Sequence, residues 1–188
     1  LRGLPPSREE ISQFLKDQSP KAYENLVDAF LSSPHYGEKM AAGWLDLVRY
    51  GDTSGFHSDV RIDLYPYREY VINAFNSNKS FADFTKEQLA GDLLENPSEE
   101  QKIATAYNRL NLMTQEGGAI EEEYLVKSQG DRIRATSVTW LGSTLGCAEC
   151  HDHKYDPFTA KDYYAFGAFF ADVKQVGVYN DLAKKGLA

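Results

Sequence analysis

The chain holds only two cysteines in 188 residues, and both lie in one short segment, Cys147-Ala148-Glu149-Cys150-His151. Cys-x-x-Cys-His is the attachment sequence for c-type haem. Two thiols three residues apart can add to the two vinyl groups on one edge of a porphyrin, and the histidine that follows is then held where it can ligate the iron. The segment predicts one covalent haem c per chain, with His151 as the proximal ligand and a domain packed around the haem.

Three other interpretations of this segment stay open. A redox dithiol of the thioredoxin type usually follows a strand in a βαβ pattern, and no such pattern precedes Cys147. A structural zinc site would draw on four neighbouring side chains, although adjacent residues rarely reach one tetrahedral ion and closed sites usually use a second, distant pair. Its ligands would be Cys147, Cys150, His151 and His153. The third interpretation is two unmodified thiols in a loop. Haem attachment remains the leading hypothesis.

The composition is that of a globular protein and excludes several functional classes. Apolar residues make up 42% of the chain and charged residues 26%. The formal net charge of -8 argues against a non-specific nucleic-acid or anionic-membrane surface and suits a basic redox partner. The sequence has no apolar run of about 18 residues that could span a membrane. Two closely spaced cysteines rule out a disulfide framework.

The length suits one domain with a real hydrophobic core. The first residues, Leu1-Arg2-Gly3-Leu4-Pro5-Pro6, resemble the interior of a longer sequence. We therefore expect residues 1–188 to be a single domain cut from a longer multidomain protein. A missing signal peptide then says nothing about localisation.

Helical periodicity runs through most of the chain. Start signals for helices are Ser7-Arg8-Glu9-Glu10, Ser19-Pro20, Ser33-Pro34 and Ser98-Glu99-Glu100-Gln101. Apolar residues recur three and four positions apart after these signals, and again in segments that begin near Pro66, Phe81, Glu121 and Thr159. The segment from Glu121 predicts a helix to Leu145, ended by Gly146. Since hairpin signals and strand alternation are missing, we predict an all-α domain of seven or eight helices around the haem.

Five stretches of the chain form one recognisable set: Ser33-Pro34-His35-Tyr36-Gly37-Glu38, Trp44-Leu45-Asp46-Leu47-Val48-Arg49-Tyr50, Gln88-Leu89-Ala90-Gly91-Asp92-Leu93-Leu94, Glu116-Gly117-Gly118, and Cys147 to Pro157. Together they resemble one family, the planctomycete cytochrome c domain of the DUF1549 group. The resemblance covers nearly the whole chain. It implies a covalent haem and an extracytoplasmic setting, periplasmic or secreted, in a large multidomain protein.

The residue opposite His151 on the iron decides between electron transfer and ligand chemistry, and the candidates are Met113, His35, His57 and His153. His153 is expected to order its loop, because it lies too close to His151 to reach the other face of the ring. His35 lies at a predicted helix start, where a capping or packing role is usual. Met113 lies just before a glycine break, where a methionine usually packs in the core. His57 lies in the polar loop 52–59, and resembling family members carry glycine-aromatic-histidine there. We predict His57 as the sixth ligand, with an open iron as the alternative.

Three charged residues, Asp131, Arg132 and Arg134, lie together on the predicted long helix. Guanidinium binds carboxylate in a two-pronged fashion, so these arginines are candidates for pairing with haem propionates. An exposed charge pair on the helix explains them equally well. Trp140, Tyr163 and Phe166 are expected beside the haem, as core or as pocket wall.

These observations favour an electron-transfer domain with one haem c, whose partner is a redox protein or a neighbouring domain of the same chain. Haem-based catalysis or small-ligand binding at an open iron is the first alternative. A zinc-stapled interaction module is the second.

Overall fold

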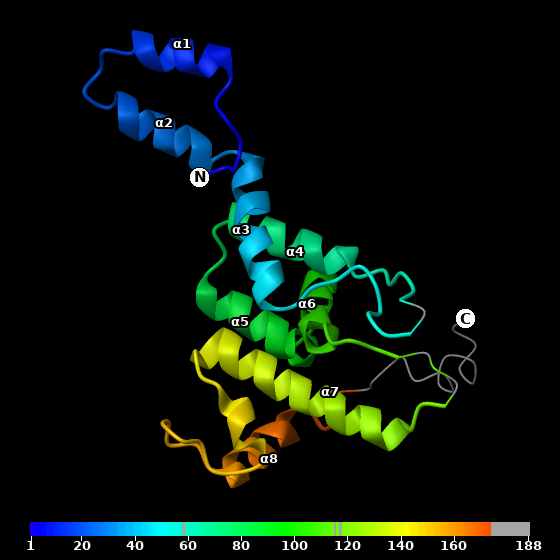
Figure 1. Ribbon diagram of the computed structural model, residues 1–188. Helices are drawn as coiled ribbons and strands as arrows, with labels where there is room; N and C mark the ends of the chain where they lie inside the picture. Colours follow the sequence, from blue (N-terminus) through cyan, green and yellow to red (C-terminus); the bar gives the residue numbers. More distant parts are fainter. Residues whose placement is uncertain (58, 115, 117, 174–188) are drawn as a thin grey trace. The chain divides into compact units, whose positions relative to one another are not determined.

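The computed structural model describes residues 1–57, 59–114, 116 and 118–173, and these residues form helices joined by loops (Figure 1). They contain eight α-helices, five shorter helical turns and no strand. Isolated bridges join Thr53 to Arg61 and Gly55 to Met113. The predicted all-α class and the predicted number of helices are confirmed. None of the described helices is long and apolar enough to cross a membrane.

The helices group into two compact units, which are described one at a time. Unit 1 comprises Leu1–Asp46 and Tyr65–Ala104. Unit 2 comprises Leu47–Leu64 and Thr105–Ala188, and its description ends at residue 173. Each unit is thus built from two separate stretches of chain. The prediction of one domain over residues 1–188 stays a prediction.

Unit 1 contains the first six α-helices. They are α1 (Arg8–Lys16), α2 (Ala22–Leu31), α3 (Pro34–Leu47, whose last residue belongs to unit 2), α4 (Tyr65–Asn76), α5 (Phe81–Ala90) and α6 (Glu99–Ala104), with the short turn η1 (Gly91–Leu93). The capping boxes predicted at Ser7 and Ser98 are both present. The predicted start at Ser19-Pro20 is wrong by two residues, because α2 begins at Ala22 with no side-chain cap.

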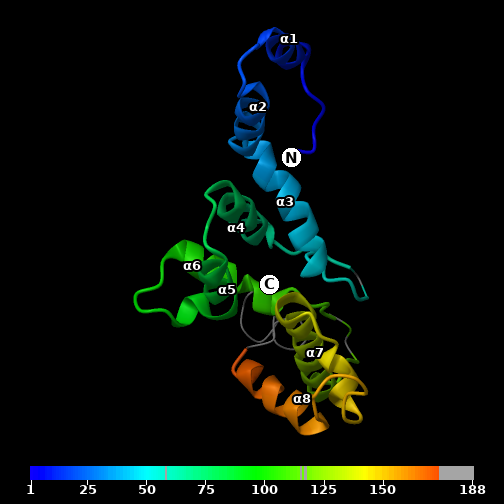
Figure 2. The same cartoon turned by 90° about the vertical axis from the view of Figure 1, so that its left-hand side faces the viewer.

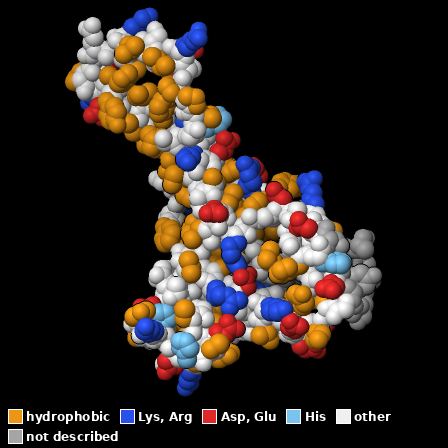
Figure 3. Space-filling model, in the orientation of Figure 1, with side chains coloured by type: hydrophobic (Ala, Val, Ile, Leu, Met, Phe, Trp, Pro, Cys, Tyr) orange, Lys and Arg blue, Asp and Glu red, His pale blue; other side chains and the backbone are white. Residues whose placement is uncertain are grey.

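Helices α1 and α2 lie beside each other and bury none of their own residues (Figures 1 and 2). Arg2 links them, since its guanidinium pairs with Glu10 of α1 at 2.5 Å and lies 4.3 Å from the ring centroid of Phe30 in α2. Large apolar side chains such as Leu15 remain exposed. Hydrophobic side chains accordingly gather over this pair of helices in Figure 3.

Buried side chains of α4 and α5 form the core of unit 1, among them Tyr67, Tyr70 and Phe84. Trp44 of α3 packs against this core. Its indole N–H is 3.2 Å from the amide oxygen of buried Gln88. Its ring contacts Phe84 edge-on, with 4.8 Å between the ring centroids. The hydrogen bond and the ring contact together hold α3 against α5.

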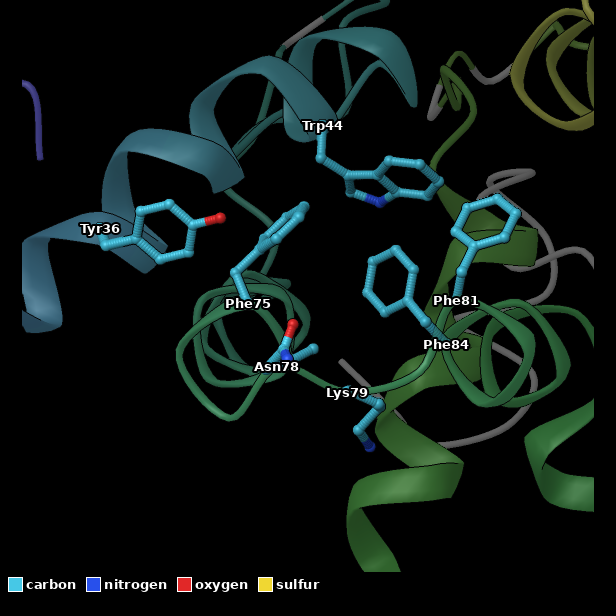
Figure 4. Close-up of a pocket in the computed structure, with 8 residues that line it drawn as sticks. Tyr36, Trp44, Phe75, Asn78, Lys79, Phe81 and Phe84 are labelled. Atoms are coloured by element: carbon cyan, nitrogen blue, oxygen red, sulfur yellow. The ribbon is translucent and has the colours of Figure 1, made fainter. Parts of the chain in front are cut away.

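Helices α3, α4 and α5 also border an open pocket of about 300 Å³ (Figure 4). Its walls are mostly aromatic and comprise Tyr36, Trp44, Phe75, Phe81 and Phe84, with Ala74, Asn78 and Lys79. None of the residues predicted to hold or ligate a haem lines this pocket.

Unit 2 contains the last two α-helices and most of the short turns. Its elements are η2 (Thr105–Arg109), α7 (Glu121–Thr136), the π-helical turn η3 (Ser137–Leu141), the 3₁₀ turns η4 (Leu145–Glu149) and η5 (Ala168–Phe170), and α8 (Ala160–Gly167). Ile133 of α7, Leu145 and Ala148 of η4, Tyr163 of α8 and Phe170 of η5 form its core.

The predicted helix from Glu121 to Leu145 is too long. The α-helix ends at Thr136, continues as η3, and stops at Gly142, which has a φ of 59°. Gly142, and not Gly146, is therefore the left-handed residue that ends the helical segment. The hydroxyl-rich and β-branched run after Ala135 is a poor helix former, which fits the change from α to π geometry.

A buried ion pair lies beside the core of unit 1. The Glu87 carboxylate accepts hydrogen bonds from the Tyr70 hydroxyl at 2.8 Å and from the Lys79 ammonium at 2.5 Å. The Glu87 side chain is 11% exposed and that of Lys79 is 18% exposed. Burial raises the pKa of Glu87, but the hydrogen bonds from Lys79, Tyr70 and Gln101 outweigh it, so the net shift of this pKa is downward.

We predict that Lys79→Met destabilises the protein by about 1–3 kcal/mol at neutral pH, because it leaves a buried carboxylate without its cation. A carboxyl whose folded pKa is depressed contributes stability above its unfolded pKa and loses it as pH falls through the folded value. The difference between variant and wild type should therefore shrink on acidification. Urea unfolding across pH measures it, with exposed Lys86→Met on α5 as the control. Equal effects of the two substitutions would contradict the prediction.

Candidate functional site

The segment Cys147 to His151 begins in η4, a 3₁₀ turn in which residues three apart fall on the same side. One side carries Leu145 and Ala148, which are 2% and 0% exposed and lie in the core of unit 2. A second side, Gly146 and Glu149, faces Arg134 of α7. The third side carries Cys147, and Cys150 follows three residues later as the C-cap of the turn; both cysteines are free and exposed. The spacing of three thus favours one outer face of the turn for the two thiols.

His151 follows this turn with an exposed side chain. Its Nδ1 lies 2.8 Å from the carbonyl oxygen of Asp152. A carbonyl oxygen only accepts, so Nδ1 carries the proton and donates, and Nε2 is the unprotonated nitrogen of the neutral ring. A hydrogen bond from one ring nitrogen to a backbone carbonyl is the usual support of a metal-ligating histidine. Two thiols on one face and this imidazole fit the donor set of a covalent haem.

His153 orders the loop between η4 and α8, as predicted from its position. Its Nδ1 accepts hydrogen bonds from the backbone N–H groups of Asp156 at 2.8 Å and Tyr155 at 3.2 Å. Its Nε2 must then hold the proton that it donates to the Thr144 hydroxyl at 2.9 Å. Since Nδ1 has no proton, its 3.7 Å approach to the Asp156 carboxylate is not an ion pair. The side chain is 6% exposed, so the loop is built around this ring.

These bonds argue against the zinc site. Both ring nitrogens of His153 are engaged within the loop, so this ring is not free to complete a tetrahedral set. Among residues 1–57, 59–114, 116 and 118–173, no three His, Cys, Asp or Glu side chains are grouped so that they could hold a metal ion. The thioredoxin interpretation fits no better, because the segment follows the helical elements α7 and η3 and not a strand.

The three charged residues of α7 differ in their surroundings. Arg132 is buried and donates through Nε to the Asn108 carbonyl oxygen at 2.6 Å, and burial lowers the pKa of its guanidinium to about 10. The expectation that Arg132 lies in an exposed charge pair is therefore wrong, and its pairing with a propionate stays a prediction. Asp131 pairs with Arg49. Arg134 is exposed and its guanidinium lies 2.8 Å from the Glu149 carboxylate.

The two leading candidates for the sixth ligand lie in adjoining segments. The backbone N–H of Met113 donates to the Ser54 carbonyl oxygen at 2.9 Å, and Gly55 forms a parallel bridge with Met113. His57 is exposed, with a φ of 54° that few residues other than glycine adopt. The choice of His57 over Met113 stays a prediction.

A small pocket of about 230 Å³ separates these segments from α7. Its lining includes Phe56, Leu112, Tyr124 and Lys127, and it reaches Arg134. Because Arg134 also pairs with Glu149, the pocket and the motif turn are neighbours along α7. Its volume is below the usual range of roughly 300–1,000 Å³ for ligand sites.

The other candidates have ordinary roles. His35 in unit 1 pairs through Nδ1 with Glu38, at 2.8 Å, on the surface of α3. Tyr163 and Phe166 pack around Leu145 and Ala148, so their expected part in the core is confirmed, and their position beside a haem stays a prediction. The Trp140 ring meets Tyr107 edge-on at 6.0 Å between centroids.

Sequence reasoning missed three residues that shape the site: Thr144, Gly146 and Glu149. Thr144 holds the His153 ring, Gly146 lies under the Arg134 side chain, and Glu149 pairs with its guanidinium. The spacing of three between Gly146 and Glu149 indicates that they share one side only once the segment is known to be a 3₁₀ turn.

We predict that His153→Ala destabilises the haem-free protein by about 1–3 kcal/mol, because it removes a ring that is 6% exposed together with its hydrogen bonds to Thr144 and to the loop backbone. His151→Ala is the matched control, since an exposed side chain changes stability by only about 0.5 kcal/mol. Urea unfolding followed by circular dichroism compares the two. If both substitutions cost the same, the loop is not built around His153.

One family model matches the chain over residues 1–175: PSCyt2, described as a protein of unknown function (DUF1549). No curated protein and no solved structure matches it. The matched range includes the motif turn, the His153 loop and α8. The family name points to a cytochrome-like domain of planctomycetes, which agrees with the resemblance drawn from the sequence. The chain belongs to the DUF1549 (PSCyt2) family.

Proposed function

We propose that this chain is a mono-haem c-type cytochrome domain that transfers electrons within an extracytoplasmic redox protein. The observation that carries the proposal is the exposure of both free cysteines, Cys147 in η4 and Cys150 at its C-cap, a spacing of three that favours one face of the turn, with His151 next in the chain. The extracytoplasmic setting is what the resemblance to planctomycete cytochrome c domains implies.

Cys147 and Cys150 would hold the group through two thioether bonds. Each sulfur adds to one carbon of a vinyl group and the thiol hydrogen passes to the other carbon, so nothing leaves and no oxidant is needed. When bound, haem supplies a reversible one-electron couple at its iron. His151 would offer Nε2 to the iron, and its ring is oriented by the hydrogen bond from Nδ1 to the Asp152 carbonyl.

The protein surface suits exchange of electrons with a partner. A net charge of -8 favours association with a basic surface, either on a separate redox protein or on a neighbouring domain of the same chain. Because both thiols are exposed, a haem attached to them would be accessible to such a partner.

The attachment test uses protein matured in a periplasm. We predict that the wild type carries the added mass of one haem and yields a pyridine haemochrome after denaturation, and that the variant with both Cys147→Ala and Cys150→Ala yields neither. Each single variant retains one thiol and serves as an intermediate control. Haem-free wild type holding stoichiometric zinc would overturn the proposal in favour of an interaction module.

For the sixth ligand we predict that His57→Ala turns the ferric spectrum high-spin and speeds cyanide binding, whereas Met113→Ala leaves the spectrum unchanged. His57→Met should stay low-spin with a raised potential, because a thioether favours ferrous iron more than imidazole does.

The reverse pattern would assign the ligand to Met113. A wild type that already binds cyanide quickly, with both alanine variants unchanged, would show an open iron and favour catalysis or small-ligand binding over electron transfer.

A further inference from the structure

We infer that Arg134 is a positioning residue for the haem-attachment turn: it clamps Gly146 and Glu149, one side of η4, and thereby holds the thiol side outward. The functional meaning of this inference rests on the proposed haem attachment. The contact itself belongs to unit 2 and can be measured in protein that carries no haem.

The first observation is steric. A Cβ atom added at Gly146 would lie 2.4 Å from Cγ and 2.9 Å from Cδ of Arg134. Real Cβ atoms do not approach other heavy atoms so closely, so the aliphatic stem of Arg134 occupies the space where a side chain at residue 146 would be. Gly146 is not among the described glycines with positive φ. Its need for glycine therefore comes from Arg134 and not from the backbone conformation.

The second observation is electrostatic. The Arg134 guanidinium lies 2.8 Å from the Glu149 carboxylate, three residues after Gly146 and on the same side of the 3₁₀ turn. The two side chains are 46% and 41% exposed, so this ion pair alone shifts an equilibrium by no more than about fivefold. The packing of the Arg134 stem on Gly146 is then the stronger half of the clamp.

Gly130 of α7 also lies close to the Arg134 side chain, where the lack of a Cβ atom makes space for the guanidinium. A Cβ atom at Gly130 would lie 3.4 Å from both terminal nitrogens of the guanidinium and 2.8 Å from the Tyr163 hydroxyl. The Tyr164 hydroxyl donates to the Glu149 carbonyl oxygen at 3.0 Å, which holds the end of the turn to α8. With Leu145 and Ala148 facing the core and Gly146 and Glu149 facing Arg134, Cys147 and Cys150 are left on the remaining side.

The test is a double-mutant cycle between residues 134 and 146. After Arg134→Ala, the remaining Cβ of residue 134 would lie 3.7 Å from a new Cβ at residue 146, an ordinary van der Waals contact. We therefore expect Gly146→Ala to loosen the turn in the wild type and to leave it unchanged in the Arg134→Ala background. Arg134→Met is the matched control, because it keeps the aliphatic stem near Gly146 and removes the charge. In the Arg134→Met background, Gly146→Ala should therefore still loosen the turn.

The measurements in haem-free protein are amide hydrogen exchange over residues 145–150 and the rate of thiol alkylation by iodoacetamide. Gly146→Ala alone should raise exchange at least tenfold, and adding Arg134→Ala should return it to the level of Arg134→Ala alone. If Gly146→Ala prevents folding, restored folding in the double variant supports the same contact. If Gly146→Ala raises exchange equally in both backgrounds, or does not raise it in the wild type, the inference is overturned.

The yield of covalent haem in the same variants separates the two proposals. It should fall severalfold in Gly146→Ala and recover in the double variant. If the wild type attaches no haem while the haem-free cycle behaves as expected, the proposed function fails and the clamp stands. If the wild type attaches haem and the cycle shows no coupling, the clamp fails alone.

Discussion

Burial of Leu145 and Ala148 determines how the motif turn is oriented. Burying a leucine side chain contributes about 1.5–3 kcal/mol, whereas an exposed ion pair such as that of Arg134 and Glu149 contributes about 1 kcal/mol or less. The core therefore decides which side of the turn faces inward. With three residues per turn, that choice and the contact of Arg134 with Gly146 and Glu149 leave the cysteines the remaining side.

The loop after the turn is ordered by polar groups. His153 can do this because a neutral imidazole is both donor and acceptor, so one ring joins the Thr144 hydroxyl to the backbone of residues 155 and 156. At the other end, the Asp152 carboxylate accepts from the Ala160 N–H at the start of α8. Both ends of the loop that follows the motif are thus tied to neighbouring elements.

The sequence was informative where a local rule governs the structure. Capping boxes at Ser7 and Ser98 were predictable because each needs only two residues three apart. The end of α7 was not, since two glycines follow it and only the backbone shows that Gly142 has the left-handed conformation. Arg132 was misassigned because an arginine on a helix looks exposed until its buried partner, the Asn108 carbonyl, is known.

The positions of the thiols bear on how a haem relates to the core. Ile133, Tyr163 and Phe170 already fill the space inside η4, and the two cysteines are exposed on another side of the turn. A haem attached as proposed would bind at this exposed side of the turn, and a group that binds only the folded protein stabilises it by mass action. That the domain packs around the haem stays a prediction, because Cys-x-x-Cys-His identifies the attachment atoms but not which side of their turn is buried.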